Sequence, residues 1–341
     1  MKKVLALILM VLVVVNIFAA CGAKTEQPEP AQAAAQPEQA QEQDSQEAVK
    51  QESKEPSPFP MSVKDAKGAD VTIEKKPEKI VSLTLGTDEM LLKLVDKSRI
   101  KAVTYLSEDP GLSNIVEEVK DISVKLNAEV EKIISIQPDL IFVADWADDK
   151  VIKQLRDAKI AVYAYKTPNG VEDQKKTVME IARLVGEEQK GQEVIQWMDE
   201  RLNAIEEKVK TLPEDKKLTA LSLDSFYSTY GKNTTFDDIA DRAGLVNLAS
   251  KQGVEGWLQI TKEKVVEMNP DVIFLPSWSY QGFDAKKFAE DFRNDKSLAG
   301  VSAVKNNRVF TLSESHMTSV SHNIVLGVED AAKAAYPDLF K

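Results

Sequence analysis

One stretch of this sequence occurs twice, and the repeat limits what the chain can fold into. Residues 131–143 (EKIISIQPDLIFV) match residues 263–275 (EKVVEMNPDVIFL) at a constant offset of 132 positions, without a gap. Each copy reads as a short helix, a Pro-Asp turn and an apolar strand, because proline stops a helix and aspartate starts the next element. A match of this length exceeds what chance provides, so we predict two lobes of related architecture.

Apolar runs rich in β-formers alternate with helical stretches on both sides of the repeat. The expected strands are 80–85, 100–105, 140–145, 160–165, 218–224, 271–277 and 308–313. The helices expected between them include 88–95, 148–158, 234–243 and 285–293. Short apolar strands separated by helices are typical of βα units with buried, parallel sheets. The sequence therefore predicts an α/β fold of two Rossmann-like lobes with central, largely parallel sheets.

Two helices are expected between the lobes. The first covers residues 171–185, and the second runs from about Glu188 to Thr211. Apolar residues recur at helical spacing on one face of the second helix. About 24 residues at 1.5 Å each give a rod of roughly 36 Å, which spans a small domain. We therefore predict an N-terminal lobe at 61–185, a single long interlobe helix at 186–212 and a C-terminal lobe at 213–341, with little freedom for hinge rotation.

The N-terminus has the features of a targeting segment. Lys2 and Lys3 precede an apolar run that is too short to favour a membrane-spanning helix. Ala19 and Ala20 stand directly before Cys21, the only cysteine. This arrangement resembles a bacterial lipoprotein signal, which implies a signal peptide at 1–20 and lipidation of Cys21. An ordinary signal peptide or an uncut membrane anchor is the alternative.

The segment after Cys21 differs in composition from the rest of the chain. Residues 22–60 are rich in Gln, Glu, Ala and Pro and have no periodic apolar face. Such a segment cannot offset the loss of chain entropy by burying apolar surface, so we expect residues 21–60 to form a disordered acidic tether. Acyl chains on Cys21 would hold the protein on the outer face of the bacterial cytoplasmic membrane, an extracytoplasmic location.

Composition excludes several classes of function. The 44 Lys and Arg residues face 55 Asp and Glu residues, a net charge of −11 that argues against a nucleic-acid partner. A single cysteine excludes intrachain disulfides and Cys-ligated clusters, and the two histidines exclude a three-histidine metal site. No Gly-x-Ser-x-Gly, His-Glu-x-x-His or phosphate-binding glycine loop is present. We therefore do not expect an enzyme, and keep an extracytoplasmic enzyme or a sensor lipoprotein as a lower alternative.

Several motifs occur in a characteristic order along residues 61–341. They are DAKGADVTI at 65–73, PEKIVSL at 77–83, GTDE at 86–89 and TFDDIADRAGLVN at 235–247. Together they resemble the Fe³⁺-siderophore/haem/vitamin B12 family of ABC-transporter solute-binding proteins, whose two α/β lobes are joined by one long helix.

The resemblance implies a function. It implies an extracytoplasmic binding protein that captures an iron chelate of siderophore type in the interlobe cleft and delivers it to an ABC permease dimer with its ATPase. Cobalamin or haem is the alternative ligand. No intrinsic cofactor is expected, since the metal arrives in the chelate. We expect a monomer, because each lobe fills its own core.

Two repeated glutamates are candidates for contact with the permease. Glu131 and Glu263 each stand seven residues before a Pro-Asp turn. The resemblance implies that these carboxylates dock onto arginines of the permease. One carboxylate per lobe suits a twofold partner, and charge complementarity fixes orientation. The alternative is a helix-start glutamate that the helix dipole favours.

The candidate ligand-binding residues follow the predicted strands, because ligands of α/β lobes contact the loops at the carboxyl ends of strands. They are Thr87, Tyr105, Trp146, Lys166, Tyr227, Trp257, Trp278, Tyr280 and His316. Trp146 and Trp278 are related by the same offset of 132 positions. We expect their indoles to face each other across the cleft, where flat aromatic faces suit a large conjugated ligand. Packing of each indole on its own lobe is the alternative.

The distribution of cations narrows the ligand class. We place none of the seven arginines at a strand end, and Lys166 is the one obvious cation there. Polyanionic ferric catecholates need bidentate cationic clamps, which arginine provides best. The sequence therefore favours a ferric hydroxamate, a corrinoid or haem. His316 is a candidate axial ligand or hydrogen-bond donor, with a plain polar surface role as the alternative.

Overall fold

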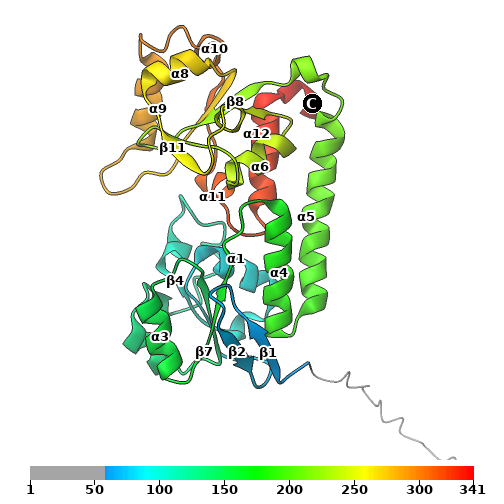
Figure 1. Cartoon of the computed structure of the whole chain (residues 1–341), viewed down its shortest axis with the longest axis vertical. Helices are drawn as coiled ribbons and strands as arrows, with labels where there is room; N and C mark the ends of the chain where they lie inside the picture. The colour runs from blue at the N-terminus through cyan, green and yellow to red at the C-terminus, as the bar shows by residue number, and fades with distance from the viewer. Residues whose placement is uncertain (1–57) are drawn as a thin grey trace, which may run out of the picture. The chain divides into compact units, whose positions relative to one another are not determined.

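A five-stranded parallel sheet forms the centre of the first lobe (Figure 1). The computed structural model describes residues 58–341, which belong to one compact unit. The predicted signal peptide, the lipidated Cys21 and most of the predicted tether lie outside the described residues. The sheet has the order β5-β4-β3-β6-β7, with β3 (Ile80–Ser82), β4 (Ile100–Thr104), β5 (Lys125–Leu126), β6 (Leu140–Ala144) and β7 (Ala161–Tyr165). An antiparallel hairpin of β1 (Met61–Lys64) and β2 (Asp70–Ile73) precedes it.

A four-stranded parallel sheet forms the centre of the second lobe. Its order is β10-β8-β12-β13, with β8 (Thr219–Ser222), β10 (Val246–Asn247), β12 (Val272–Leu275) and β13 (Val309–Thr311). Beside it, β9 (Ser228–Tyr230) and β11 (Trp257–Gln259) form an antiparallel ribbon that the sequence analysis did not predict. The α/β fold with parallel sheets in both lobes is confirmed.

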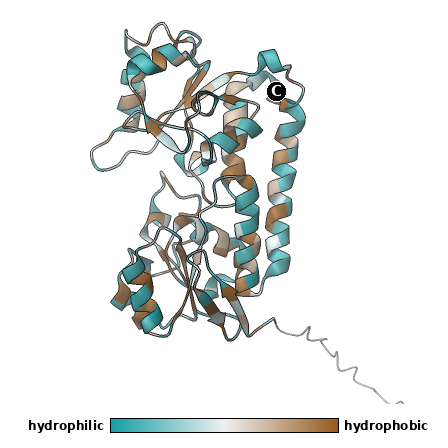
Figure 2. Ribbon diagram, in the orientation of Figure 1, coloured by the Kyte–Doolittle hydropathy of each residue, from teal (hydrophilic) through white to brown (hydrophobic). Residues whose placement is uncertain are grey.

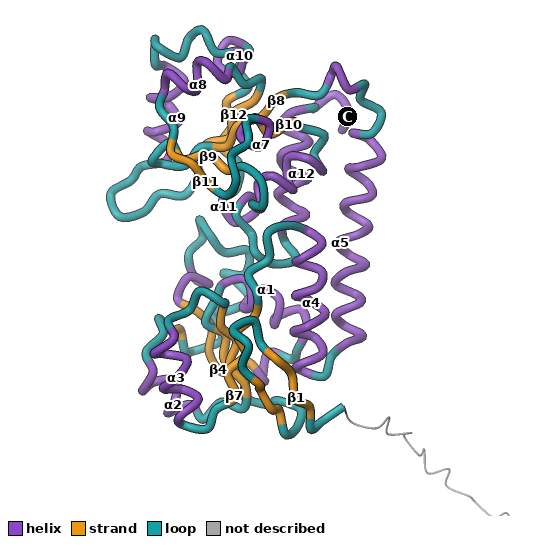
Figure 3. Tube along the Cα trace, in the orientation of Figure 1, coloured by secondary structure: helices purple, strands orange, loops and turns teal. Residues whose placement is uncertain are grey.

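Helices flank both sheets (Figure 3). In the described part of the chain they are α1 (Leu85–Leu94), α2 (Val130–Ile136), α3 (Asp149–Asp157), α4 (Val171–Val185), α5 (Glu188–Val209), α6 (Thr235–Arg242), α7 (Leu248–Lys251), α8 (Lys262–Met268), α9 (Ala285–Asn294), α10 (Ser302–Lys305), α11 (Glu314–Met317) and α12 (Ile324–Ala335). Helix α1 begins three residues before the predicted start at residue 88. The cause is Thr84, whose side chain accepts a hydrogen bond from the Thr87 amide and so caps the helix earlier.

The long helix α5 runs beside elements of both lobes (Figure 1). It packs against α1 and α4, and also against α6 and α12. Its 22 residues give a length of about 33 Å at 1.5 Å per residue. Figure 2 shows the alternation of hydrophilic and hydrophobic residues along α4 and α5 that this packing requires. The buried face includes Val194, Met198 and Leu202, as the helical spacing predicted. None of the helices in residues 58–341 has the length and apolar character needed to cross a membrane.

The sequence repeat is a structural repeat. Both copies form a helix, α2 or α8, that ends in a left-handed residue, Gln137 or Asn269, and leads into the central strand β6 or β12. The two aspartates of the turns have equivalent partners. Asp139 accepts hydrogen bonds from the amides of Glu78 and Lys79 ahead of β3. Asp271 accepts two from the amide and hydroxyl of Thr219 in β8. The repeat therefore fixes the same strand pairing in each lobe.

The candidate ligand cleft

Loops at the carboxyl ends of strands from both sheets meet between the lobes. Asp109, in the segment after β4, accepts a hydrogen bond of 3.0 Å from the indole N–H of Trp278, which follows β12. Asn114 donates from its amide group to the backbone carbonyl of Ser315, at 2.9 Å, in the segment after β13. The carboxyl edges of the two sheets thus face a common interlobe space, which is where ligands of parallel α/β sheets bind.

A buried carboxylate joins the two lobes beside this space. Glu89 in α1 is 3% exposed. One carboxylate oxygen accepts hydrogen bonds from the backbone and side-chain amides of Asn114, at 3.1 and 2.9 Å. The other accepts from the Ser321 hydroxyl and from the Asn323 side-chain amide in the second lobe. Four donors from both lobes therefore converge on one carboxylate, a contact that the sequence analysis missed.

A pocket of about 220 Å³ lies at the carboxyl edge of the second-lobe sheet. Its wall includes Phe236, Phe274 and Met317, and its polar groups include Asp224 and Glu314. Burial raises the pKa of the Glu314 carboxyl, although the amide of Ser277 donates a hydrogen bond to it. The pocket therefore combines apolar walls with carboxylate acceptors, which suits a ligand portion that is apolar or donates hydrogen bonds.

The predicted residues Trp278 and Tyr280 come together in the cleft. Their rings stack with centroids 4.4 Å apart and an interplanar angle of 21°. The Tyr280 hydroxyl is also 2.9 Å from the Ser225 hydroxyl. Since Trp278 also donates to Asp109 of the first lobe, this aromatic pair spans the interlobe space.

Three other predicted aromatics present free ring surface. Tyr105, Trp146 and Trp257 are 52%, 72% and 70% exposed, and Lys166 is also exposed. Phe226 and Leu258 add exposed apolar surface beside Trp257 on the β9–β11 ribbon. Trp146 and its repeat mate Trp278 differ, because Trp278 is held by Asp109 and Tyr280 while Trp146 is open to solvent. That the two indoles face each other stays a prediction.

Three predicted ligand residues have contacts within their own lobes, and for the buried Thr87 we correct the assignment. Thr87 is fully buried and bonds the hydroxyl of Thr84, because α1 begins before it. Tyr227 packs on Phe288 and Phe292 in the second lobe, with centroids 5.7 and 6.1 Å away. The His316 Nδ1 atom is 2.6 Å from a carboxylate oxygen of Asp330, which ties α11 to α12. That Tyr227 and His316 contact the ligand stays a prediction.

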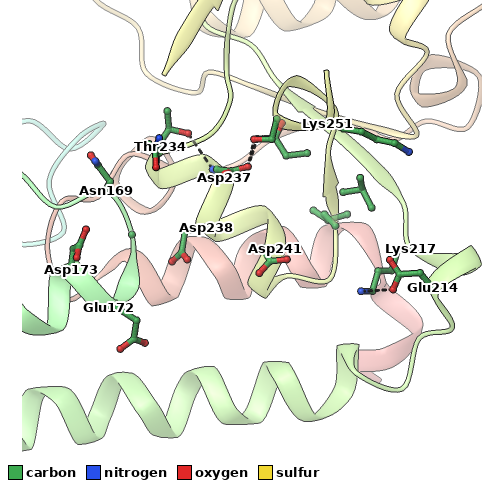
Figure 4. A pocket seen from close by; sticks show the side chains of 16 residues that line it. Asn169, Glu172, Asp173, Glu214, Lys217, Thr234, Asp237, Asp238, Asp241 and Lys251 are labelled. Carbon is green, nitrogen blue, oxygen red and sulfur yellow. Dashed lines mark hydrogen bonds and ion pairs between the residues drawn. The ribbon is translucent and has the colours of Figure 1, made fainter. Parts of the chain in front are cut away.

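A larger hollow of about 620 Å³ lies where α4 begins beside α6, and it reaches β10 (Figure 4). Its lining is acidic, and two of the carboxylates have several partners within the protein. Asp238 accepts from the Val171 amide at 2.7 Å and from Arg242 at 3.1 Å. Asp237 accepts from the side chains of Asn247 and Ser250. This hollow is a surface between packed elements, and the smaller pocket at the strand ends is the better ligand site.

The predicted docking glutamates lie on exposed parts of the repeat helices. Glu131 is in the first turn of α2, and Glu263 is in the first turn of α8. Backbone and Thr261 hydrogen bonds lower the pKa of the Glu263 carboxyl. Within residues 58–341 neither carboxylate forms an ion pair. Both are therefore free to meet a cation on another molecule.

Two parallel-sheet lobes whose strand-end loops are in contact, with one long helix beside both lobes, define a two-lobed ligand-binding protein. The chain belongs to the periplasmic binding protein family, whose sequence pattern matches residues 80–315. The function of the chain is accordingly that of a substrate-binding component of an ABC importer, and this family and the structural neighbours are binding proteins.

Three relatives illustrate the range of ligands among similar proteins. The chain is 33% identical over 289 residues to the uncharacterized ABC transporter substrate-binding lipoprotein YvrC of Bacillus subtilis, covering 83% of this chain and 88% of YvrC. It is 24% identical to a cobalamin-binding protein of Halobacterium salinarum, over 63% of this chain and 58% of the relative. It is 27% identical to the probable siderophore-binding lipoprotein YfiY of Bacillus subtilis, over 72% of this chain and 77% of YfiY.

The fold is also that of a solved structure. The Haemophilus influenzae protein MolA, crystallised with molybdate, superposes with a TM-score of 0.69 at 22% identity. The superposition covers 82% of this chain and 92% of MolA.

Proposed function

We propose that this protein captures an iron chelate of siderophore type in its interlobe cleft and passes it to the permease of an ABC importer. The observation that carries the proposal is the meeting of the two lobes at their strand ends, with the Trp278–Tyr280 pair between them. The absence of arginine from the cleft residues named above supports a hydroxamate chelate rather than a polyanionic catecholate. The named ligand of YfiY supports the siderophore class.

Cobalamin is the second candidate ligand, and the aromatic content of the cleft favours it. The stacked Trp278–Tyr280 pair and the exposed rings of Trp146 and Trp257 offer flat apolar surface to a corrin. The cobalamin-binding relative supports this alternative. Haem shares the flat shape but adds carboxylates, which the Asp224 and Glu314 carboxylates of the pocket would repel.

Titration of tryptophan fluorescence tests the ligand. A ferrichrome-type ferric hydroxamate, cyanocobalamin and haem are added separately, and calorimetry checks each apparent affinity. We expect saturable binding of the ferric hydroxamate. Tight binding of cyanocobalamin alone would replace the siderophore assignment with the second candidate, and no heat or quenching with any of the three would contradict a metal chelate as ligand.

Truncation of Trp146 tests whether its exposed ring contributes to the cleft. We expect Trp146→Ala to weaken chelate binding about tenfold, the loss of about 1.4 kcal/mol that is typical of an aromatic contact residue. The midpoint of thermal unfolding should not change, because the ring is 72% exposed. Trp197→Phe is the control, since Trp197 lies in α5 and packs on His322. Equal affinities for both variants would remove Trp146 from the site.

We further propose that acyl chains on Cys21 anchor the protein at the outer face of the cytoplasmic membrane as a monomer, and that Glu131 and Glu263 dock it onto the permease. Reversal of both charges, Glu131→Arg with Glu263→Arg, should abolish uptake of the chelate and leave its affinity unchanged. The control pair Glu74→Arg with Glu290→Arg makes the same charge change at exposed positions, one in each lobe. Normal uptake by the first pair would contradict docking through these residues.

A further inference from the structure

The exposed large apolar side chains of residues 58–341 fall into two groups. Five of the seven follow strands or lie in β11, and they are Tyr105, Trp146, Phe226, Trp257 and Leu258. The other two are Ile134 and Val266, at 37% and 41% exposure. Since Val266 follows Ile134 by the 132 positions of the repeat, the two occupy equivalent places, one on each lobe.

The two helices expose these residues in the same way. In each helix the preceding residue, Ile133 or Val265, is fully buried and anchors the helix to its lobe. Ile134 and Val266 follow it on the outer side, where neither core cluster includes them. Folding of the lobes thus gains little from an aliphatic residue at either position. Burial on a partner would be favourable, at about 25 cal/mol for each Å² of apolar surface covered.

Each exposed aliphatic residue has a carboxylate beside it. Glu131 precedes Ile134, and Glu263 precedes Val266, by three residues, which places each pair on one helix face. The neighbouring lysines are already engaged. Lys264 pairs with Glu267 at 2.8 Å, and the Lys132 ammonium donates to the backbone carbonyl of Lys125. Each helix therefore presents an aliphatic side chain and an unpaired carboxylate as one small patch, which we call the α2 patch and the α8 patch.

We propose that the α2 and α8 patches are two copies of one contact, in which Ile134 and Val266 enter apolar hollows on the two halves of a twofold-symmetric membrane partner. The inference rests on the proposed function, which supplies that partner as the permease dimer. Equivalent patches on two related lobes suit a partner whose own surface is duplicated. Each carboxylate requires a cation at the rim of the partner's hollow. Because a charge pair at the rim buries little apolar area, the aliphatic side chains supply that area.

The double variant Ile134→Gln with Val266→Gln tests the apolar part of this contact. Glutamine is a good helix former, so both helices should fold. The gene of each variant replaces the wild-type gene in the source strain. Uptake of the chelate identified by the fluorescence titration is then measured with the receptor at a limiting concentration. We expect uptake to fall tenfold or more in the double variant and partially in each single variant, while chelate affinity and thermal unfolding stay unchanged.

The matched control is Ser135→Gln with Glu267→Gln. These residues are also repeat mates, exposed on the same helices one position further on, and this pair should keep normal uptake. If the double variant of Ile134 and Val266 takes up the chelate normally, the apolar contact is wrong while the proposed function stands. If the purified protein binds no chelate, the proposed function itself fails. If ultracentrifugation finds a dimer that the double variant converts to a monomer, the patches serve self-association and the inference is overturned.

Discussion

Lowering the pH from about 7.5 to about 4.5 should remove about 2.7 kcal/mol of the free energy of unfolding through His322 alone. His322 is 2% exposed, and neither ring nitrogen has a hydrogen-bond partner in the described structure. Its ring packs against Trp197 with centroids 5.6 Å apart. Burial, with a smaller contribution from the nearby Lys93 ammonium, lowers the pKa of His322 from 6.5 to about 3.

The sign follows from where the proton binds. Below pH 6.5 the unfolded chain takes up a proton on this imidazole, whereas the folded protein does not until the pH approaches 3. The contribution of His322 to the free energy of unfolding is therefore fully present above pH 6.5. It falls by about 1.36 kcal/mol for each pH unit between pH 6.5 and the folded-state pKa of about 3.

Urea unfolding of the wild type and of His322→Phe, at several pH values, measures this contribution. Phenylalanine keeps an aromatic ring against Trp197 but cannot be protonated. The free energy of unfolding of the variant should fall less steeply below pH 6.5, and the two curves should diverge by about 2.7 kcal/mol at pH 4.5. Parallel curves would show that the imidazole is not held neutral in the folded protein.

Loss of the Glu89 carboxylate should destabilise the protein by about 3 kcal/mol or more, because hydrogen bonds to a buried charged group contribute about 1.5–3 kcal/mol each. Glu89→Ala leaves the donors of Asn114, Ser321 and Asn323 without their acceptor. Chelate affinity should fall as well, since the hydrogen bonds from Ser321 and Asn323 join the second lobe to Glu89 in the first.

Graded substitutions separate the role of Glu89 from a general effect of mutation. Glu89→Gln keeps one carbonyl acceptor for Asn114 but turns an amide toward the Asn323 donor, so its loss should be intermediate. Glu117→Ala is the control, because Glu117 is exposed and its ion pair in the described part of the chain is with the exposed Lys120. Unfolding in urea and calorimetric titration with the chelate measure both effects. Equal stability of Glu89→Ala and Glu117→Ala would show that the lobes do not depend on this carboxylate.

The fold could be predicted because its signals are local. Each βα unit carries its own apolar run and its own turn residues, and the repeat shows the same unit twice. The error at α1 has a local cause too, because Thr84 acts as a helix cap inside what reads as a continuing strand. The antiparallel β9–β11 ribbon was missed because its strands have only three residues each. In β11, Trp257, Leu258 and Gln259 are all exposed, so no alternation of apolar and polar residues marks a buried face.

The cleft was harder to predict, since its contacts join residues far apart in the sequence. Tyr105 and Trp146 follow strands, so their exposed rings could be predicted from the sequence, and that they line the cleft stays a prediction. The Glu89 contacts were not, because Ser321 and Asn323 lie more than 230 positions away and carry no pattern. Thr87 has a side chain of the expected kind, but it is buried and bonds Thr84 within its own lobe.

The packing of α5 against elements of both lobes has a consequence for how receptors compete for the importer. We expect a receptor braced in this way to keep nearly the same outline whether it is full or empty. Empty copies then compete with loaded ones for the same importer. The rate of import should therefore depend on the fraction of receptors that carry ligand. When the ligand is scarce, a cell that overproduces the receptor should slow its own import.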